Sequence, residues 1–133
     1  MDRKTLIAKV KAAGVVGAGG AGFPTHVKLE GNIDTVIVNG AECEPLLAVD
    51  IGLMQSQTEL LVESLKQAVN ILGARAGVIA IKGKHQVAAG RLREALDGKE
   101  NLSLKLLRDA YPVGDEQVLV YEGLGRTVPE GGI

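Results

Sequence analysis

The chain has 133 residues, 46% of them apolar and 2% aromatic, and its fifteen basic and sixteen acidic residues leave a formal charge of −1. This length is typical of one domain, residues 1–133, and the scarcity of rings predicts a core of Val, Ile, Leu and Ala. The balanced charge and the few rings exclude a nucleic-acid surface, and no segment is long and apolar enough for direct membrane insertion.

The first half of the chain predicts two helices and a strand. Residues 3–12 are amphipathic and are followed by Gly14, which predicts a short helix that ends there. The run "TVIV" at 35–38 predicts a buried strand. Apolar residues recur at helical spacing through 53–72, and Gly73 follows as a stop, which predicts one long helix.

The second half continues the alternation of strands and helices. The run "VIAI" at 78–81 predicts a second buried strand, and residues 87–96 predict a helix that closes near Gly98. Leucines alternate with polar residues over 102–106, which predicts a strand with one wetter face. A further helix is predicted at 116–122.

This order predicts the α/β class. Strands that alternate with helices form a parallel sheet with right-handed crossovers. We therefore expect a three-layer Rossmann-like sheet with helices on both faces, preceded by a helix and a glycine-rich loop. Ligands bind such sheets outside the carboxyl ends of the strands, so the segments that follow each strand are the candidates for a site.

The stretch "GVVGAGGAGFPTHVKL" at 14–29 contains the spacing G-x-G-x-x-G of a dinucleotide fingerprint. That fingerprint needs a preceding strand and a following crossover helix, whereas here a helix precedes and Pro24 interrupts the chain soon after. A flexible linker is also a poor interpretation, because the stretch lacks serine and contains Val, Ala and Phe. A phosphate cradle remains, in which glycine N–H groups approach an anion, Thr25 donates and Lys28 adds a charge.

Polar loops follow each predicted strand: "NGAECEP" at 39–45, "KGKH" at 82–85 and "RDAYPVGDE" at 108–116. We interpret 82–85 as a solvated helix entry. The acids of the other two loops are good acceptors for sugar hydroxyls and ring N–H groups. An anionic ligand with a polyol and a hydrogen-bonding ring fits both these loops and the cradle.

Each residue of these loops also has a structural interpretation. Asp115 precedes a predicted helix, so capping is at least as good an explanation as ligand contact. Asn39 is equally a turn residue, and Tyr111 equally a core ring. Cys43, the single cysteine, lies between two acids that raise its thiol pKa, so we interpret it as a spacer. One cysteine excludes an internal disulfide and a cysteine-based metal site, and it is compatible with the cytoplasm.

Three segments in this order, "GVVGAGGAGFPTHVKL", "VNGAECEP" and "YPVGDEQVLVYEGLGRTVPEGG", resemble the FMN- and NADH-binding region of the complex I 51-kDa subunit family. Within it, the chain is similar to the corresponding subunit of the Rnf electron-transport complex, the proline-reductase-associated electron-transfer protein and the cobalamin reductase of propanediol utilisation. The resemblance implies a segment of an NADH dehydrogenase-like oxidoreductase that acts with other subunits. It also implies a cytoplasmic location, peripheral to the inner face of the cell membrane through those subunits.

The resemblance implies a set of FMN-contacting residues, none of them catalytic. The glycine loop that wraps the FMN phosphate and ribityl chain corresponds to Gly17, Gly19, Gly20, Ala21 and Gly22, with its lysine at Lys28. The segment along the flavin corresponds to Asn39, Glu42, Glu44 and Pro45. The segment that meets the ring and the nicotinamide side corresponds to Tyr111, Gly114, Asp115 and Glu116.

Two departures from the family pattern shape the expected function. An aspartate of the family falls on Ala41, and the segments that complete the flavin site and hold 4Fe-4S clusters would lie beyond Ile133. We therefore expect a fragment of a longer iron–sulfur flavoprotein that relays electrons between NAD(H) or a ferredoxin-type donor and such clusters. The alternatives are a docking module with an incomplete flavin site and a phosphate-handling transferase. Against the transferase, the Walker spacing is absent.

Overall fold

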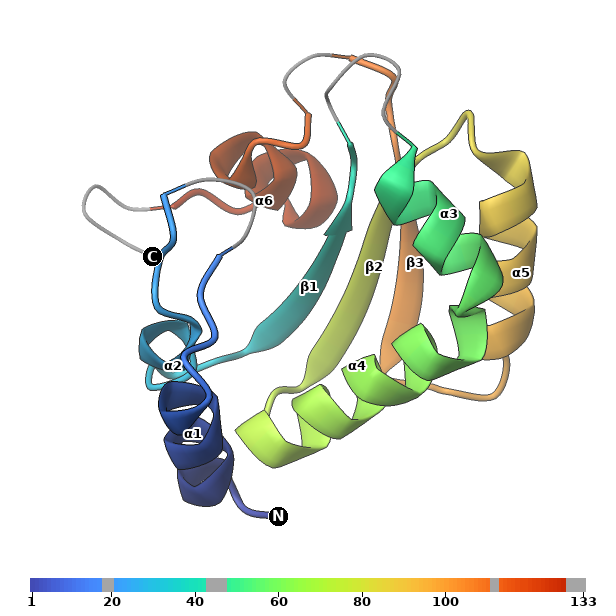
Figure 1. The fold of residues 1–133 in the computed structure, drawn as a ribbon. Coiled ribbons are helices and arrows are strands. Elements are labelled where there is room, and N and C mark those ends of the chain that lie inside the picture. The colour runs from blue at the N-terminus through green and yellow to red at the C-terminus, as the bar shows by residue number, and fades with distance from the viewer. Residues whose placement is uncertain (18–20, 43–47, 111–112, 129–133) are drawn as a thin grey trace.

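The computed structural model describes residues 1–17, 21–42, 48–110 and 113–128. The strands are β1 (Thr35–Gly40), β2 (Ala76–Lys82) and β3 (Leu102–Leu107). The helices are α1 (Arg3–Ala12), α2 (Thr25–Lys28), α3 (Val49–Ser56), α4 (Thr58–Leu72), α5 (Gln86–Leu96) and α6 (Glu116–Leu124). Figure 1 shows the sheet at the centre, with α3, α4 and α5 over one face.

The three strands are parallel and lie in the order β1-β2-β3. Because this spatial order equals the chain order, right-handed crossovers place both connections on the same face, α3 with α4 after β1 and α5 after β2. Helix α6 follows β3 and packs against the opposite face. The predicted fold class, a three-layer parallel sheet with helices on both faces, is confirmed.

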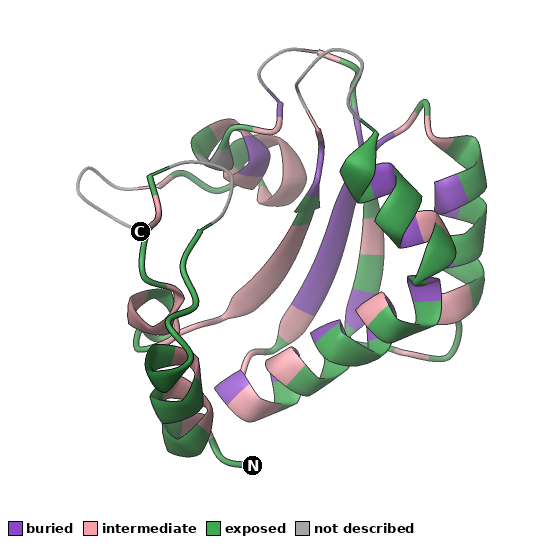
Figure 2. Ribbon diagram, in the orientation of Figure 1, coloured by how far each residue is buried: buried purple, intermediate pink, exposed green. Residues whose placement is uncertain are grey.

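The larger core lies between the sheet and α3, α4 and α5. Ile79 and Ile81 of the central strand are completely buried there. The buried residues of α4 are spaced three and four positions apart, so they form one face of the helix. The helices contribute Ile51, Met54, Val62, Leu65, Val69, Ala88, Ala89, Leu92 and Leu96. Figure 2 shows buried residues along β2 and on α3, α4 and α5.

A smaller core lies on the other face, under α6. It consists of Ala41, Ala80, Leu107, Val113 and Leu119. Ser103 and Lys105 of β3 are exposed on this face, which shows that helix α6 covers it only near the carboxyl ends of the strands. The two faces of the sheet are therefore buried to different extents.

The prediction of one helix over residues 53–72 is wrong. The segment forms two helices that meet at Gln57, whose backbone dihedrals are φ −126° and ψ 35°. The buried Thr58 hydroxyl donates a hydrogen bond of 2.5 Å to the carbonyl of Met54, so a side chain satisfies a backbone acceptor at the break. The stop at Gly73 is confirmed, with φ +70° in the left-handed region.

The strand predicted over residues 102–106 is present, but burial does not alternate along its whole length. Leu102 and Leu104 pack against the larger core, whereas Leu106 on the same side is exposed. The buried residue at the end of the strand is Leu107, which points to the other face and contacts the smaller core. The short helix α2 was not predicted, because a single turn has no apolar periodicity.

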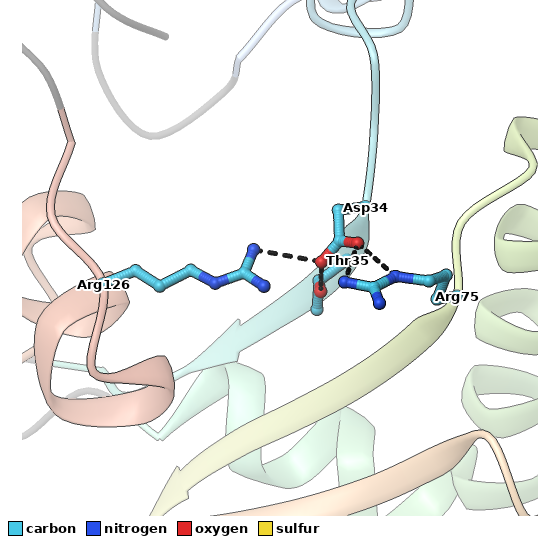
Figure 3. Close-up of polar contacts among 4 residues, drawn as sticks. All are labelled: Asp34, Thr35, Arg75 and Arg126. Carbon is cyan, nitrogen blue, oxygen red and sulfur yellow. Dashed lines mark hydrogen bonds and ion pairs between the residues drawn. The ribbon is translucent and has the colours of Figure 1, made fainter.

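Asp34, just before β1, joins three parts of the chain at the amino ends of the strands. Its carboxylate pairs with Arg75 before β2 and, at 3.0 Å, with Arg126 after α6 (Figure 3). The Thr35 hydroxyl donates to the same carboxylate at 2.9 Å. These hydrogen bonds, first that of Thr35 and then that of Arg75, lower the pKa of Asp34 below its ordinary value of 3.8.

Candidate functional site

The loops that follow β1 and β3 meet at the carboxyl edge of the sheet. The Asn39 amide donates a hydrogen bond of 2.9 Å to the carbonyl of Gly114, and its oxygen accepts one of 3.1 Å from the Ala41 amide. Asn39 is therefore not only a turn residue, since it connects positions 75 residues apart in the chain. The structure thus brings together Asn39 and Gly114, two of the predicted site residues.

Gly40, the last residue of β1, is closely packed. A Cβ on Gly40 would lie 2.8 Å from Cγ2 of Ile81 and 2.9 Å from Sδ of Met54, and nearer still to Cε of Met54. The position therefore requires glycine for packing rather than for backbone freedom. This contact positions Ala41 and Glu42, which follow Gly40, at the edge of the sheet.

Glu42 carries a buried oxygen that has no partner among the described residues. Its Oε2 is buried and makes no hydrogen bond within the part of the chain that the structure describes. A buried carboxylate oxygen left without a donor costs free energy, so such an atom usually has a partner in the functional state. Glu42 is suited to accept a hydrogen bond from a ligand at this edge.

Asp115 caps α6. One of its carboxylate oxygens accepts hydrogen bonds of 3.0 Å and 3.3 Å from the backbone N–H groups of Gln117 and Val118. This is the capping role that the sequence gives as the alternative to ligand contact, and it fixes the start of the helix. Glu116 is the first residue of α6.

The interpretation of residues 82–85 as a solvated helix entry is wrong for Lys82. Its side chain is only 9% exposed, and its ammonium lies 3.4 Å from the Asp109 carboxylate. Lys84, half exposed, contacts the other oxygen of Asp109 at 3.1 Å. Hydrogen bonds from the lysines, that of Lys84 above all, lower the pKa of Asp109. The strand alternation was the signal that could have found Lys82, because it continues the face of the buried Ala80.

The described part of the glycine-rich segment is held by its own contacts. The Gly17 amide donates to the Phe23 carbonyl at 3.0 Å, and Val16 and Pro24 form an isolated antiparallel bridge. The exposed Lys28 has its ammonium 5.4 Å from the centre of the Phe23 ring, within the range of a cation–π contact. Figure 1 shows the two arms of this segment rising from α1 and α2.

The glycines of this segment differ in what the fold requires of them. Gly22 has φ +66°, a conformation that L side chains rarely adopt. A Cβ on Gly17 would meet nothing nearer than the Phe23 amide nitrogen at 3.6 Å, and its φ is not positive. Among the described residues, no contact requires glycine at position 17.

Several predicted site residues lie outside the described residues: Gly19, Gly20, Glu44, Tyr111, and with them Cys43 and Pro45. Ala21 is described and exposed. Among the described residues, no group of three or more His, Cys, Asp or Glu side chains is arranged to hold a metal ion. The helices in the same ranges are all too short or too polar to cross a membrane.

A groove of about 410 Å³ lies beside the free edge of β1. Asn39 lines it together with Val38 of the strand, Leu53 of α3 and Leu60 of α4. The exposed Leu53 and Leu60 make it largely apolar. Among the predicted site residues whose side chains the structure describes, Asn39 alone lines the groove. Glu42 does not line it, and neither does Lys82.

Comparisons with known proteins relate this chain to FMN-binding proteins. The family model described as the Nuo51 FMN-binding domain matches residues 10–133. The chain is 49% identical over 96% of its length to the cobalamin reductase PduS of Citrobacter freundii. It is 40% identical, over its whole length, to a subunit of the Na(+)-translocating ferredoxin:NAD(+) oxidoreductase complex of Acetobacterium woodii.

The chain spans 28% and 31% of these two relatives. Among solved structures, it is similar to a chain of an NAD+-reducing NiFe hydrogenase in the air-oxidized state, with a TM-score of 0.80 and 28% identity. That likeness covers 95% of this chain and 25% of the hydrogenase chain. These findings confirm the resemblance derived from the three sequence segments.

Proposed function

Because this chain belongs to the Nuo51 FMN-binding domain family, we propose that it holds FMN at the carboxyl edge of its sheet and relays electrons between NAD(H) or a ferredoxin-type donor and iron–sulfur clusters. The family match over residues 10–133 is the observation that carries the proposal. When bound, FMN supplies the hydride and single-electron chemistry, and the protein supplies binding and orientation.

The described residues fit this cofactor. Gly17 carries no Cβ, and the nearest described atom to the place of one is the Phe23 amide nitrogen at 3.6 Å, so an anion can approach the Gly17 backbone closely. The buried oxygen of Glu42 has no donor within the described ranges, and the flavin ring and ribityl chain carry N–H and hydroxyl donors. Asn39 and Gly114 hold the two adjoining loops together.

We assign the cofactor contacts in three groups, none of which acts as a nucleophile or general acid. The FMN phosphate and ribityl chain are assigned to Gly17, Gly19, Gly20, Ala21, Gly22 and Lys28. The flavin is assigned to Asn39, Glu42 and Glu44. The ring and nicotinamide side is assigned to Tyr111, Gly114, Asp115 and Glu116, of which Asp115 also caps α6.

The finer parts of the proposal rest on the relatives. One is named a cobalamin reductase and another belongs to a ferredoxin:NAD(+) oxidoreductase complex. We propose that other subunits or domains supply the iron–sulfur clusters, and that the protein lies in the cytoplasm and reaches the membrane surface only through such partners. The alternative is a docking module without a complete flavin site.

Titration with FMN, with riboflavin as the phosphate-free control, tests the proposal. We expect saturable quenching of FMN fluorescence and weaker binding of riboflavin. Lys28→Ala should weaken FMN binding by about 1.5–3 kcal/mol, the scale of a hydrogen bond to a charged group, and leave riboflavin binding unchanged. If neither this chain nor the full-length polypeptide binds FMN, the docking module becomes the better explanation.

Two glycine variants separate ligand contact from structure. Gly17→Ala should weaken FMN binding at least tenfold while the free energy of unfolding stays within about 0.5 kcal/mol of the parent. Gly90→Ala is the matched control, because Gly90 lies on the exposed side of α5 and a Cβ there meets nothing within 4 Å. The control should bind FMN like the parent. Equal binding by both variants would contradict the assignment of Gly17.

A further inference from the structure

Lys82 is a buried cation that the proposed flavin contacts do not include. It ends the central strand β2, and its side chain is 9% exposed. Among the residues that the structure describes, its ammonium has one partner, an Asp109 oxygen 3.4 Å away. An ammonium carries three N–H donors, so two of them lack a protein acceptor within these ranges.

The pair with Asp109 does not by itself explain why a lysine lies there. Asp109 is 52% exposed and is shared with Lys84, which lies closer to it at 3.1 Å. Two cations therefore compete for one solvated carboxylate. Burial of an ammonium costs free energy unless its donors are satisfied, and one long contact offsets little of that cost.

Lys82 and Glu42 lie at the same edge of the sheet. Gly40 pairs with Ile81, so Ala41 follows beside Lys82 and Glu42 is the next residue. Side chains alternate along β2, and Ala80 packs in the smaller core, so Lys82 points to the α6 face. That face also receives the Asn39 side chain, which bonds to Gly114. Among the described residues, this face of the edge therefore carries ammonium donors of Lys82 that have no protein acceptor.

We propose that Lys82 is a further flavin-binding residue, whose ammonium donates to a carbonyl oxygen of the pyrimidine ring of FMN. The inference rests on the proposed function and deepens it. The pyrimidine edge presents carbonyl oxygens, which are acceptors suited to the ammonium donors of Lys82. Reduced flavin carries negative charge on this ring, so a neighbouring ammonium favours the reduced form.

The experiment compares Lys82→Met with Lys84→Met in the full-length polypeptide reconstituted with FMN. Lys82→Met keeps the length of the side chain and removes its charge, whereas Lys84→Met removes a half-exposed charge from the same Asp109 carboxylate. The readouts are the dissociation constant of FMN and the midpoint potential of the bound flavin, neither of which requires an electron acceptor. Thermal unfolding of the apoprotein shows whether each variant is folded.

We expect Lys82→Met to weaken FMN binding about tenfold and to lower the preference for reduced over oxidised FMN about tenfold, which equals about 30 mV for a two-electron couple. Lys84→Met should change either quantity less than about twofold, because solvent screens its charge. Lys82→Arg should retain most of the parent's potential.

Three results would overturn the inference. An unchanged potential in Lys82→Met would show that the ammonium does not act on the flavin. Equal shifts in both methionine variants would show a general charge effect of the cluster, and a large loss of thermal stability in Lys82→Met with normal binding by the folded fraction would show a structural role. If the parent itself binds no FMN, the proposed function fails first, which distinguishes the two failures.

Discussion

The two faces of the sheet differ in what their side chains do. The face under α3, α4 and α5 is aliphatic along its whole length, from Val36 and Val38 through Ile79 and Ile81 to Leu102 and Leu104. The opposite face is covered by α6 only near the carboxyl ends of the strands, and it carries Asn39, Lys82 and Lys105 among its apolar residues. One face supplies the stability of the fold, and the other carries polar groups that the fold does not fully satisfy.

This difference explains why the candidate site lies where it does. Parallel strands end at the same edge, and there the loops after β1 and β3 are joined by the hydrogen bond from Asn39 to Gly114. The aliphatic face holds the strand ends in register, so the polar face can present Asn39 and Lys82 in fixed positions. Substitutions on the two faces should therefore separate stability from binding.

The largest expected effect is on the aliphatic face. Ile79→Ala removes a completely buried side chain and should lower the free energy of unfolding by about 2–5 kcal/mol. Lys105→Ala, at an exposed position on the other face of the sheet, is the control and should change it by less than about 0.5 kcal/mol. Urea unfolding measures both. Similar losses in the two variants would contradict the asymmetry of the faces.

A smaller loss of stability is expected at Gly40, the closely packed last residue of β1. Gly40→Ala places a Cβ against Met54 and Ile81 and should cost about 1–3 kcal/mol of stability. The matched Gly17→Ala, whose Cβ meets only ordinary contacts, should leave the urea midpoint unchanged. If Gly40→Ala is as stable as the parent, close packing does not position the loop after β1.

The hydrogen bond from Asn39 to Gly114, which joins the loops after β1 and β3, should contribute still less to the free energy of unfolding. Asn39→Asp keeps the oxygen that accepts from the Ala41 amide and loses the donor to the Gly114 carbonyl. We expect a loss of about 0.5–1.5 kcal/mol, the net value of one hydrogen bond. Asn32→Asp, in the exposed loop before β1, serves as the control in the same urea experiment. An equal loss in the control would attribute the effect to charge alone.

The smallest effect concerns Asp34, at the opposite end of the sheet. Its native pKa lies below the ordinary 3.8, so the unfolded chain takes up the proton first as the pH falls. The stability from this carboxylate is therefore present above 3.8 and is lost as the pH falls through the lower native pKa. The parent should exceed Asp34→Asn in urea midpoint at pH 7, and the difference should shrink below about pH 3. A constant difference would show that protonation of Asp34 is not responsible.

Much of the fold was predictable because its signals are local. The helix at Arg3–Ala12, the aliphatic strands and the stop at Gly73 follow from periodicity and from the conformational freedom of glycine. The break at Gln57 was not predictable in this way, since apolar spacing continues across it and the Thr58 bond to Met54 forms only in the folded chain. Burial of Leu107 rather than Leu106 likewise depends on which helix covers which face.

The features of the candidate site likewise divide into those that the sequence predicts and those that depend on the tertiary structure. The sequence by itself determined the class of fold, the edge at which polar loops gather and, through three short segments, the resemblance to a flavin-binding family. Only the tertiary structure decided that Lys82 is buried, that Asn39 joins the loops after β1 and β3, and that the Glu42 oxygen has no donor in the part of the chain that the structure describes. Composition and spacing record which residues a loop contains, whereas burial and hydrogen bonding depend on segments brought together from distant parts of the chain.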